Sequence, residues 1–210
     1  NTTASYNVAV GTSALGANTT GATNTAVGNN ALVFNTTASN NTAVGSSALY
    51  ANTTGTTNTA VGALSMQSAT TANFNTAVGY DAGGDITTGS SNTVLGMEAL
   101  SKTTTGGSNT AVGQGALNFN TTASNNTAVG ATALAANTTG IENVAVGSGC
   151  LDLNTTGSYN TAMGNASLDA NTTGGGNVAI GMTALGANTT ASNNVAIGYN
   201  AAQVNTDGTE

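Results

Sequence analysis

Apolar and polar residues alternate in a short segment that returns at regular intervals along the chain. Residues 25–27 (Thr-Ala-Val) and 178–180 (Val-Ala-Ile) place larger β-branched residues on either side of an Ala, and each run ends at a Gly. Alternation with a period of two is typical of a strand with two different faces. The pattern therefore predicts one strand of about four residues in each repeat.

The interval between these segments is constant at 17 residues. A Gly closes the strand of every unit, at Gly11, Gly28, Gly45, Gly62, Gly79, Gly96, Gly113, Gly130, Gly147, Gly164, Gly181 and Gly198. An Asn begins every unit, at Asn7, Asn24, Asn41, Asn58, Asn75, Asn92, Asn109, Asn126, Asn143, Asn160, Asn177 and Asn194. Residues 1–6 form a partial repeat and residues 7–210 form twelve units, so the sequence predicts one continuous solenoid without a separate domain.

The rest of each unit consists of turn residues and a second apolar pair. The common pattern is N-T-A-V-G-x-x-A-L-x-x-N-T-T-G-x-x, whose positions we number one to seventeen. Ala-Leu at positions eight and nine predicts a shorter extended piece, and N-T-T-G from position twelve predicts a turn. No unit has an apolar stripe at helical spacing. We therefore predict an all-β fold, a parallel β-solenoid or β-roll of twelve 17-residue coils.

Stacking these units in register should bury two columns of side chains. We expect the position-four residues to form one column, at Val10, Val27, Val44, Val61, Val78, Leu95, Val112, Val129, Val146, Met163, Ile180 and Ile197. We expect Leu or Met at position nine to form the other, and the Asn at position one to hydrogen-bond from rung to rung. The opposite strand face, with only Ala and Gly, then suits close packing against a sister chain, which favours a trimeric fibre over a monomer.

The composition excludes several classes of partner and chemistry. The chain has one basic residue and eight acidic residues, a net charge of −7, and 4% charged residues against about 25% in an average protein. Nucleic acid and membrane are therefore not expected partners. The chain has no His, so a Ser-His or Cys-His pair is impossible and we expect no enzyme, no metal and no cofactor. Asp81 and Asp85 are interpreted as a solvated loop, and Lys102 as the ion-pair partner of Asp85.

The lone Cys150 stands where most units have Ala, so we expect it to act as a small buried side chain rather than as a disulfide partner. The N-T-T turns also create N-x-[ST] sequons, which are candidate glycan attachment sites in a surface protein. The candidates are Asn18, Asn35, Asn52, Asn120, Asn137, Asn154, Asn171 and Asn188. The alternative interpretation is that Asn-Thr-Thr is simply favourable turn chemistry.

The pattern N-T-A-V-G-x-x-A-L-x-x-N-T-T-G, clearest in residues 41–55 and 126–140, resembles the repeat shafts of phage tail-fibre-like and bacterial surface proteins. Those proteins often end in an endosialidase-type intramolecular chaperone. The strand motif at residues 177–181 is also similar to the unit of trimeric autotransporter adhesin heads, which are left-handed parallel β-rolls of three chains. The resemblance covers the full length, although the period of 17 residues is longer than that of the adhesin heads.

The resemblance and the repeat together suggest an extracellular, structural fibre shaft on a virion or a cell surface. Such a shaft presents a binding tip that recognises surface glycans, and this segment begins within a repeat, as a piece of a longer fibre would. Its expected partner is itself, as a homotrimer or as an end-to-end filament. Two alternatives remain open at this point. One is a self-assembling, glycosylated surface filament, and the other is an ice- or glycan-binding solenoid that uses the Thr and Asn ladders.

Overall fold

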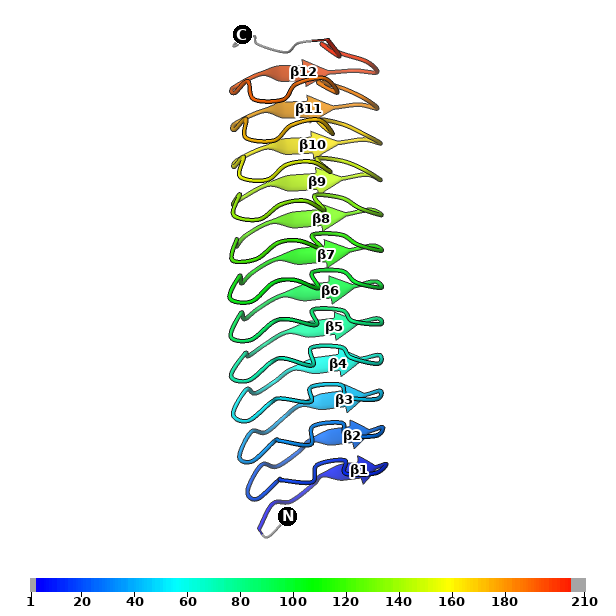
Figure 1. Cartoon of the computed structure of the whole chain (residues 1–210), viewed down its shortest axis with the longest axis vertical. Coiled ribbons are helices and arrows are strands. Elements are labelled where there is room, and N and C mark those ends of the chain that lie inside the picture. The colour runs from blue at the N-terminus through cyan, green and yellow to red at the C-terminus, as the bar shows by residue number, and fades with distance from the viewer. Residues whose placement is uncertain (1–2, 205–210) are drawn as a thin grey trace.

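The chain winds into a stack of closely similar coils around one long axis (Figure 1). The structure is a computed structural model that describes residues 3–204, so the first two residues of the partial repeat and the last six of the final unit lie outside it. Each of the first eleven units makes one full coil, and all twelve units contribute one strand to the same wall of the stack. The predicted all-β parallel solenoid with a 17-residue period is confirmed.

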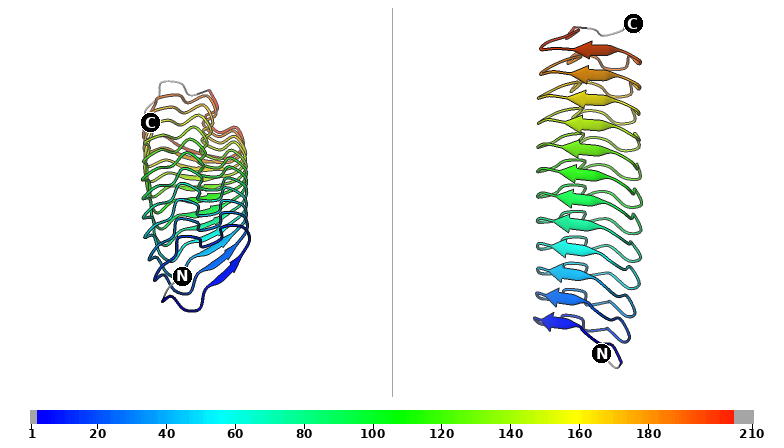
Figure 2. Two further views of the ribbon diagram at one scale, coloured as in Figure 1. Left: turned by 60° about the horizontal axis from the view of Figure 1, so that its bottom comes forward. Right: turned by 180° about the vertical axis from the view of Figure 1, so that it is seen from behind.

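Twelve short strands form a single parallel sheet in which every strand lies beside the strand of the next coil. Seen from behind, these strands lie one above another along the whole rod (Figure 2). The strands are β1 Val8–Val10, β2 Thr25–Val27, β3 Thr42–Val44, β4 Thr59–Val61, β5 Thr76–Val78, β6 Thr93–Leu95, β7 Thr110–Val112, β8 Thr127–Val129, β9 Val144–Val146, β10 Thr161–Met163, β11 Val178–Ile180 and β12 Val195–Ile197. Equivalent positions pair throughout, as when Thr25 pairs with Thr42 and Val27 pairs with Val44.

The Asn at position one fixes this register from inside the coil. The side chain of Asn41 is buried, and its Oδ1 accepts the backbone N–H of Asn58 in the next coil at 2.9 Å. Its Nδ2 donates to the carbonyl of Gly55 at 2.9 Å, which joins the beginning and the end of the same coil. In several coils the amides also bond directly, as from Asn58 Nδ2 to Asn41 Oδ1 at 3.2 Å. A buried backbone N–H needs such a partner, so one side chain serves both the coil and the stack.

The strand faces are reversed relative to the sequence prediction. The middle residue of every strand from β2 to β12 is buried, and it is Ala in all of these except β6, where it is Val94. The position-four residues instead point outward and are half-buried or exposed, with Leu95 at 49% and Ile197 at 68%. The prediction that position four forms an inner column is therefore wrong, because alternation defines two faces but does not say which one is inside.

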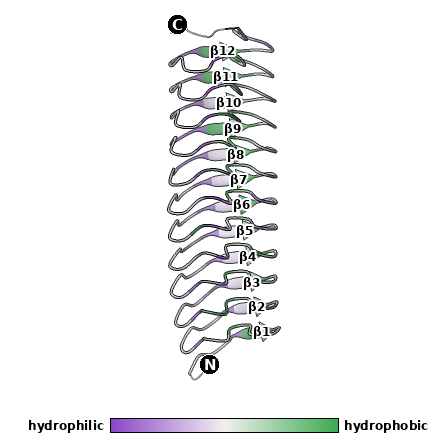
Figure 3. Ribbon diagram, in the orientation of Figure 1, coloured by the Kyte–Doolittle hydropathy of each residue, from purple (hydrophilic) through white to green (hydrophobic). Residues whose placement is uncertain are grey.

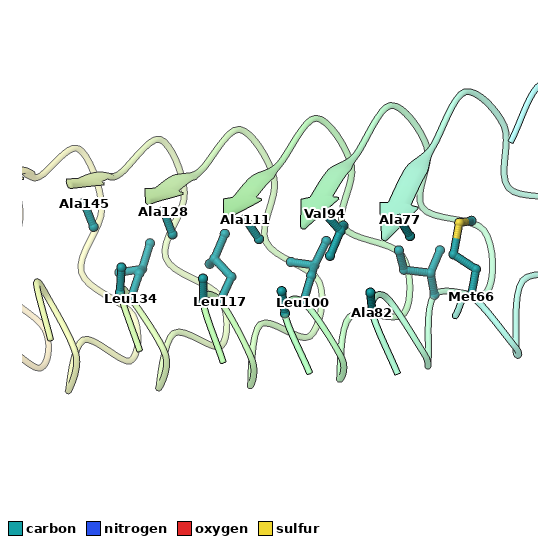
Figure 4. Close-up of a cluster of buried hydrophobic side chains, with 14 of the residues drawn as sticks. Met66, Ala77, Ala82, Val94, Leu100, Ala111, Leu117, Ala128, Leu134 and Ala145 are labelled. Atoms are coloured by element: carbon teal, nitrogen blue, oxygen red, sulfur yellow. The ribbon is translucent and has the colours of Figure 1, made fainter. Parts of the chain in front are cut away.

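The inner column at position nine is confirmed. Leu32, Leu117 and Leu185 are fully buried, as are their equivalents in most coils. In Figure 4 the strand residues Ala111 and Ala128 point toward Leu117 and Leu134 on the opposite wall. The Ala face therefore packs against Leu of its own chain and is not a surface for a sister chain. Because Leu fills the narrow space between the walls, only small side chains fit on the strand.

The wall opposite the strands has no strand of its own among the described residues, and the shorter extended piece predicted for Ala-Leu does not form. From position twelve to position one of the next unit, burial follows a period of three. Asn35 and Ala38 of the second unit and Asn41 at the start of the third are buried, while the pairs between them are half-buried or exposed. The N-T-T-G segment is thus a regular part of the wall as well as a bend.

Left-handed backbone makes the corners of each coil. Position nine is left-handed even where it is Leu, as at Leu117 with φ 52°, and positions seven and seventeen repeat this conformation. The Gly at position five has a different requirement. Gly113 has φ +130°, and a Cβ built on it would lie 2.5 Å from the carbonyl oxygen of Gly130. Both the conformation and the close approach of the next coil therefore demand Gly at this position.

Candidate functional site

The outward-facing ladders are the surfaces through which this protein can act, because the interior is filled. The described residues contain no group of three or more His, Cys, Asp and Glu side chains that could hold a metal ion. No helix able to span a bilayer occurs between residues 3 and 204. The candidate sites are therefore the rows of side chains that repeat along the outside of the rod.

The eight candidate glycan sites do not lie on that outside. Asn18, Asn35, Asn52, Asn120, Asn137, Asn154, Asn171 and Asn188 all have between 0% and 2% of their surface exposed. Asn137 shows why: its Nδ2 donates to Asn120 Oδ1 at 2.9 Å and to the carbonyl of Gly140 at 2.9 Å. A glycan on that nitrogen would replace these bonds and would have no space. Burial of these amides argues against glycan attachment at the eight positions in the folded chain.

These residues instead form a second inner Asn ladder at position twelve. The ladder runs through Asn18, Asn35 and Asn52, and again from Asn120 to Asn188. Between these runs stand Ala69, Ile86 and Thr103, which interrupt it. Asn52 is the last Asn before the interruption, and its Oδ1 is buried without a hydrogen-bond partner. At the other end of the interruption, Thr103 Oγ1 accepts a hydrogen bond from Asn120 Nδ2 at 3.1 Å, so the first Asn of the second run has a partner there.

Cys150 behaves as a small buried side chain, as predicted from its position. Its Sγ donates to the carbonyl of Ala162 at 3.2 Å, and burial raises the pKa of the thiol from 9.0 to about 12. Ser65 and Ser167 occupy the same position in other coils and donate to the equivalent carbonyls. The thiol therefore replaces a hydroxyl in a structural role.

Within residues 3–204, the charged side chains lie outside the strands. Lys102 and Asp85 form an exposed ion pair with Nζ 3.2 Å from Oδ2, as predicted, and Asp81 Oδ2 accepts from Ser101 Oγ at 2.6 Å. Asp152 and Asp169 occupy the same position in adjacent coils. Burial raises the pKa of each carboxyl, and the Asp169 carboxylate raises that of Asp152 further.

The outer face of the sheet, in contrast, carries no charge. Position two is Thr or Val and position four is Val, Leu, Met or Ile in every strand. Figure 3 shows the most hydrophobic strands at β1, β9, β11 and β12, where Val stands at position two. Sequence reasoning missed this surface because it assigned position four to the interior.

Two polar ladders follow the N-T-T segment. Thr at position thirteen donates its hydroxyl to the position-thirteen carbonyl of the next coil, as from Thr53 Oγ1 to Thr70 O at 3.1 Å. Thr at position fourteen is exposed in every described coil. No family model, no curated protein and no solved structure matches the chain, so the geometry alone defines these surfaces.

Proposed function

We propose that the protein is a structural fibre shaft, a rigid spacer that holds another part of its fibre away from a virion or cell surface. The observation that supports this proposal most is the uninterrupted axial bonding: each coil contacts its neighbours along the rod through the sheet and through Asn side chains. Twelve strands at about 4.8 Å give a rod of about 58 Å. A rod of this construction resists bending because every coil is hydrogen-bonded to the next.

The proposed fibre contains three parallel copies that meet through the outer faces of their sheets. A chain with a net charge of −7 repels a second copy wherever carboxylates face each other, and the outer sheet face is free of charge along its length. A face about 58 Å long and about 10 Å wide offers about 600 Å² per chain, the order of an ordinary protein interface. The half-buried Val and Ile side chains supply the apolar contact.

Sedimentation equilibrium tests this assembly. The chain of 20.0 kDa should sediment with three times that mass, and Val112→Glu, in the middle of the outer face, should shift it to the monomer. Asn118→Glu is the matched control, because its position already carries Asp in the coils of Asp152 and Asp169. A monomeric wild-type chain would contradict the trimer.

Electron microscopy of the native source tests the function itself. Antibodies raised against the repeat and labelled with gold should decorate thin projections on virions or on cell surfaces. Label confined to the cell interior, or absent from any projecting fibre, would contradict the proposal.

A further inference from the structure

The Thr residues at position fourteen form a single file of exposed side chains along the rod, which we call the Thr rank. The rank has eleven members, one in each of the first eleven units: Thr20, Thr37, Thr54, Thr71, Thr88, Thr105, Thr122, Thr139, Thr156, Thr173 and Thr190. In the twelfth unit position fourteen is Asp207. All are exposed. Ten steps of about 4.8 Å give the rank a length of about 48 Å.

The fold does not account for Thr at this position. The neighbouring Thr at position thirteen uses its hydroxyl between coils, as from Thr138 Oγ1 to Thr155 O at 2.9 Å, but within residues 3–204 no hydroxyl of the Thr rank bonds to the protein. Other outward positions differ freely from coil to coil: position eleven is Phe34, Asp85 and Lys102 in three of them. An exposed residue without an internal role would be expected to vary in the same way, yet position fourteen is Thr in eleven consecutive units and changes only in the last unit, to Asp207.

Glycosylation signals do not account for it either. Position fourteen is the Thr of the N-x-T sequon, but three coils lack the Asn and have Ala69, Ile86 and Thr103 in its place. Thr71, Thr88 and Thr105 are nevertheless present in those coils. The Thr rank therefore continues where the sequon and the second Asn ladder are both interrupted.

Hydrogen bonds between adjacent coils fix the backbone that carries the rank. The carbonyl of Thr155 accepts the N–H of Thr138 at 2.9 Å and the N–H of Thr139 at 3.2 Å, in addition to the Thr138 hydroxyl. The same arrangement recurs along the rod, as at Thr172, which accepts from Thr155 and Thr156. Because Thr is also stiff at χ1, the rank presents methyl and hydroxyl groups at fixed intervals.

We propose that the Thr rank is a binding site for an ice surface, a ligand that repeats with a fixed spacing as the rank itself does. Each contact is weak and uncharged, and many contacts made at once by a rigid array give a strong total. A soluble sugar is the less favourable ligand, since saccharide and other small-molecule sites are concave and combine several different groups. The rank is a row of one residue type on the outside of the rod.

The test is thermal hysteresis and ice shaping, measured on the folded 210-residue chain at millimolar concentration. We expect a gap between melting and freezing and faceted ice crystals. Thr105→Tyr, in the middle of the rank, should reduce the gap several-fold. Ser108→Tyr is the matched control in the same coil, because position seventeen is exposed and already holds Phe74 and Tyr159 in other coils. Circular dichroism should show that both variants fold.

Absence of hysteresis and of faceting in the folded wild-type chain would overturn the proposal. An equal loss in the two folded variants would overturn it as well, because the effect would then not belong to the rank. Binding to polysaccharides without any effect on ice would assign the rank to a glycan instead. Sedimentation of the same samples measures the mass of the assembly, which tests the fibre proposal. That proposal does not depend on position fourteen, so the two proposals can fail independently.

Discussion

The side chain of Ile86 fills the space that Leu fills in neighbouring coils. Gly83 stands at position nine, where most other coils have Leu or Met, and a Cβ built on Gly83 would lie 2.8 Å from Ile86 Cδ1. Ile86 is three positions later and fully buried, where most coils have an Asn of the second ladder. In this coil the large buried side chain therefore comes from position twelve and not from position nine, and the core stays filled.

This relationship predicts strong coupling between the two positions. Gly83→Leu overfills the core, and Ile86→Asn buries an amide and leaves a cavity, so each change should lower the free energy of unfolding by about 2–4 kcal/mol. The double change restores the common pattern and should cost at least 1 kcal/mol less than the sum of the single changes. Urea titrations of the wild type, the two single variants and the double variant measure these free energies of unfolding. Strict additivity would contradict the shared space.

The interruption of the second Asn ladder predicts unequal roles for two Asn residues. Asn137 accepts from Asn154 Nδ2 at 3.0 Å and donates twice, whereas Asn52 donates twice and accepts from nothing. Asn137→Ala also leaves the Asn154 amide with one acceptor fewer. It should therefore destabilise the chain by about 1 kcal/mol more than Asn52→Ala. Thermal unfolding of both variants measures the difference, and equal losses would contradict the ladder.

The reversal of the strand faces predicts a further pair of results. Leu117 is fully buried and Val112 is half-buried on the outer face. Leu117→Ala should lower the free energy of unfolding by about 2–5 kcal/mol, and Val112→Ala by about 1 kcal/mol or less in the monomer. Chemical denaturation at concentrations where the chain is monomeric separates these values. A larger loss of unfolding free energy for Val112→Ala than for Leu117→Ala would contradict the observed faces and would indicate that position four points inward.

The coil length and the parallel stacking could be predicted from the sequence, because the repeat unit corresponds to one coil. The recurrence of Gly113 and its equivalents fixes the coil length, and a parallel stack of short strands follows from it. The inner face could not be predicted, since Ala111 and Val112 alternate equally well in either orientation. Choosing between them needs the opposite wall, where Leu117 fills the interior beside Ala111, so the smaller strand residue faces inward.

The candidate sites were less predictable, since sequence motifs do not indicate burial. Asn137-Thr138-Thr139 reads equally well as a sequon and as part of an inner ladder. The signal that distinguishes them was present as a period of three, with Asn or small residues at positions twelve, fifteen and one. The N-T-T-G motif that carries this period is also typical of a turn, and a turn does not indicate that the Asn137 side chain points inward.

Cys150 provides a prediction about reactivity and pH. Because the pKa of its thiol is raised from 9.0 to about 12, the folded chain keeps a proton that the unfolded chain loses. The corresponding stability is complete below pH 9 and is lost as the pH rises from 9 to 12. A thiol reagent at pH 8 should label Cys150 only after denaturation.

Cys150→Ser serves as the matched variant, because Ser65 and Ser167 already occupy this position in other coils. The Ser variant should fold with similar stability at pH 7 and should lose the part of the alkaline destabilisation that comes from the thiol. Rapid labelling of the folded wild-type chain would show that Cys150 is accessible and would contradict its burial.

Each 17-residue unit adds one rung to the rod, so the length of the rod is set by the number of units. Duplication of residues 109–159, which comprise three complete units, tests it most directly. Small-angle X-ray scattering should show a maximum dimension longer by about 14 Å, three steps of about 4.8 Å, with an unchanged cross-section. An unchanged length with a thicker cross-section would contradict the account.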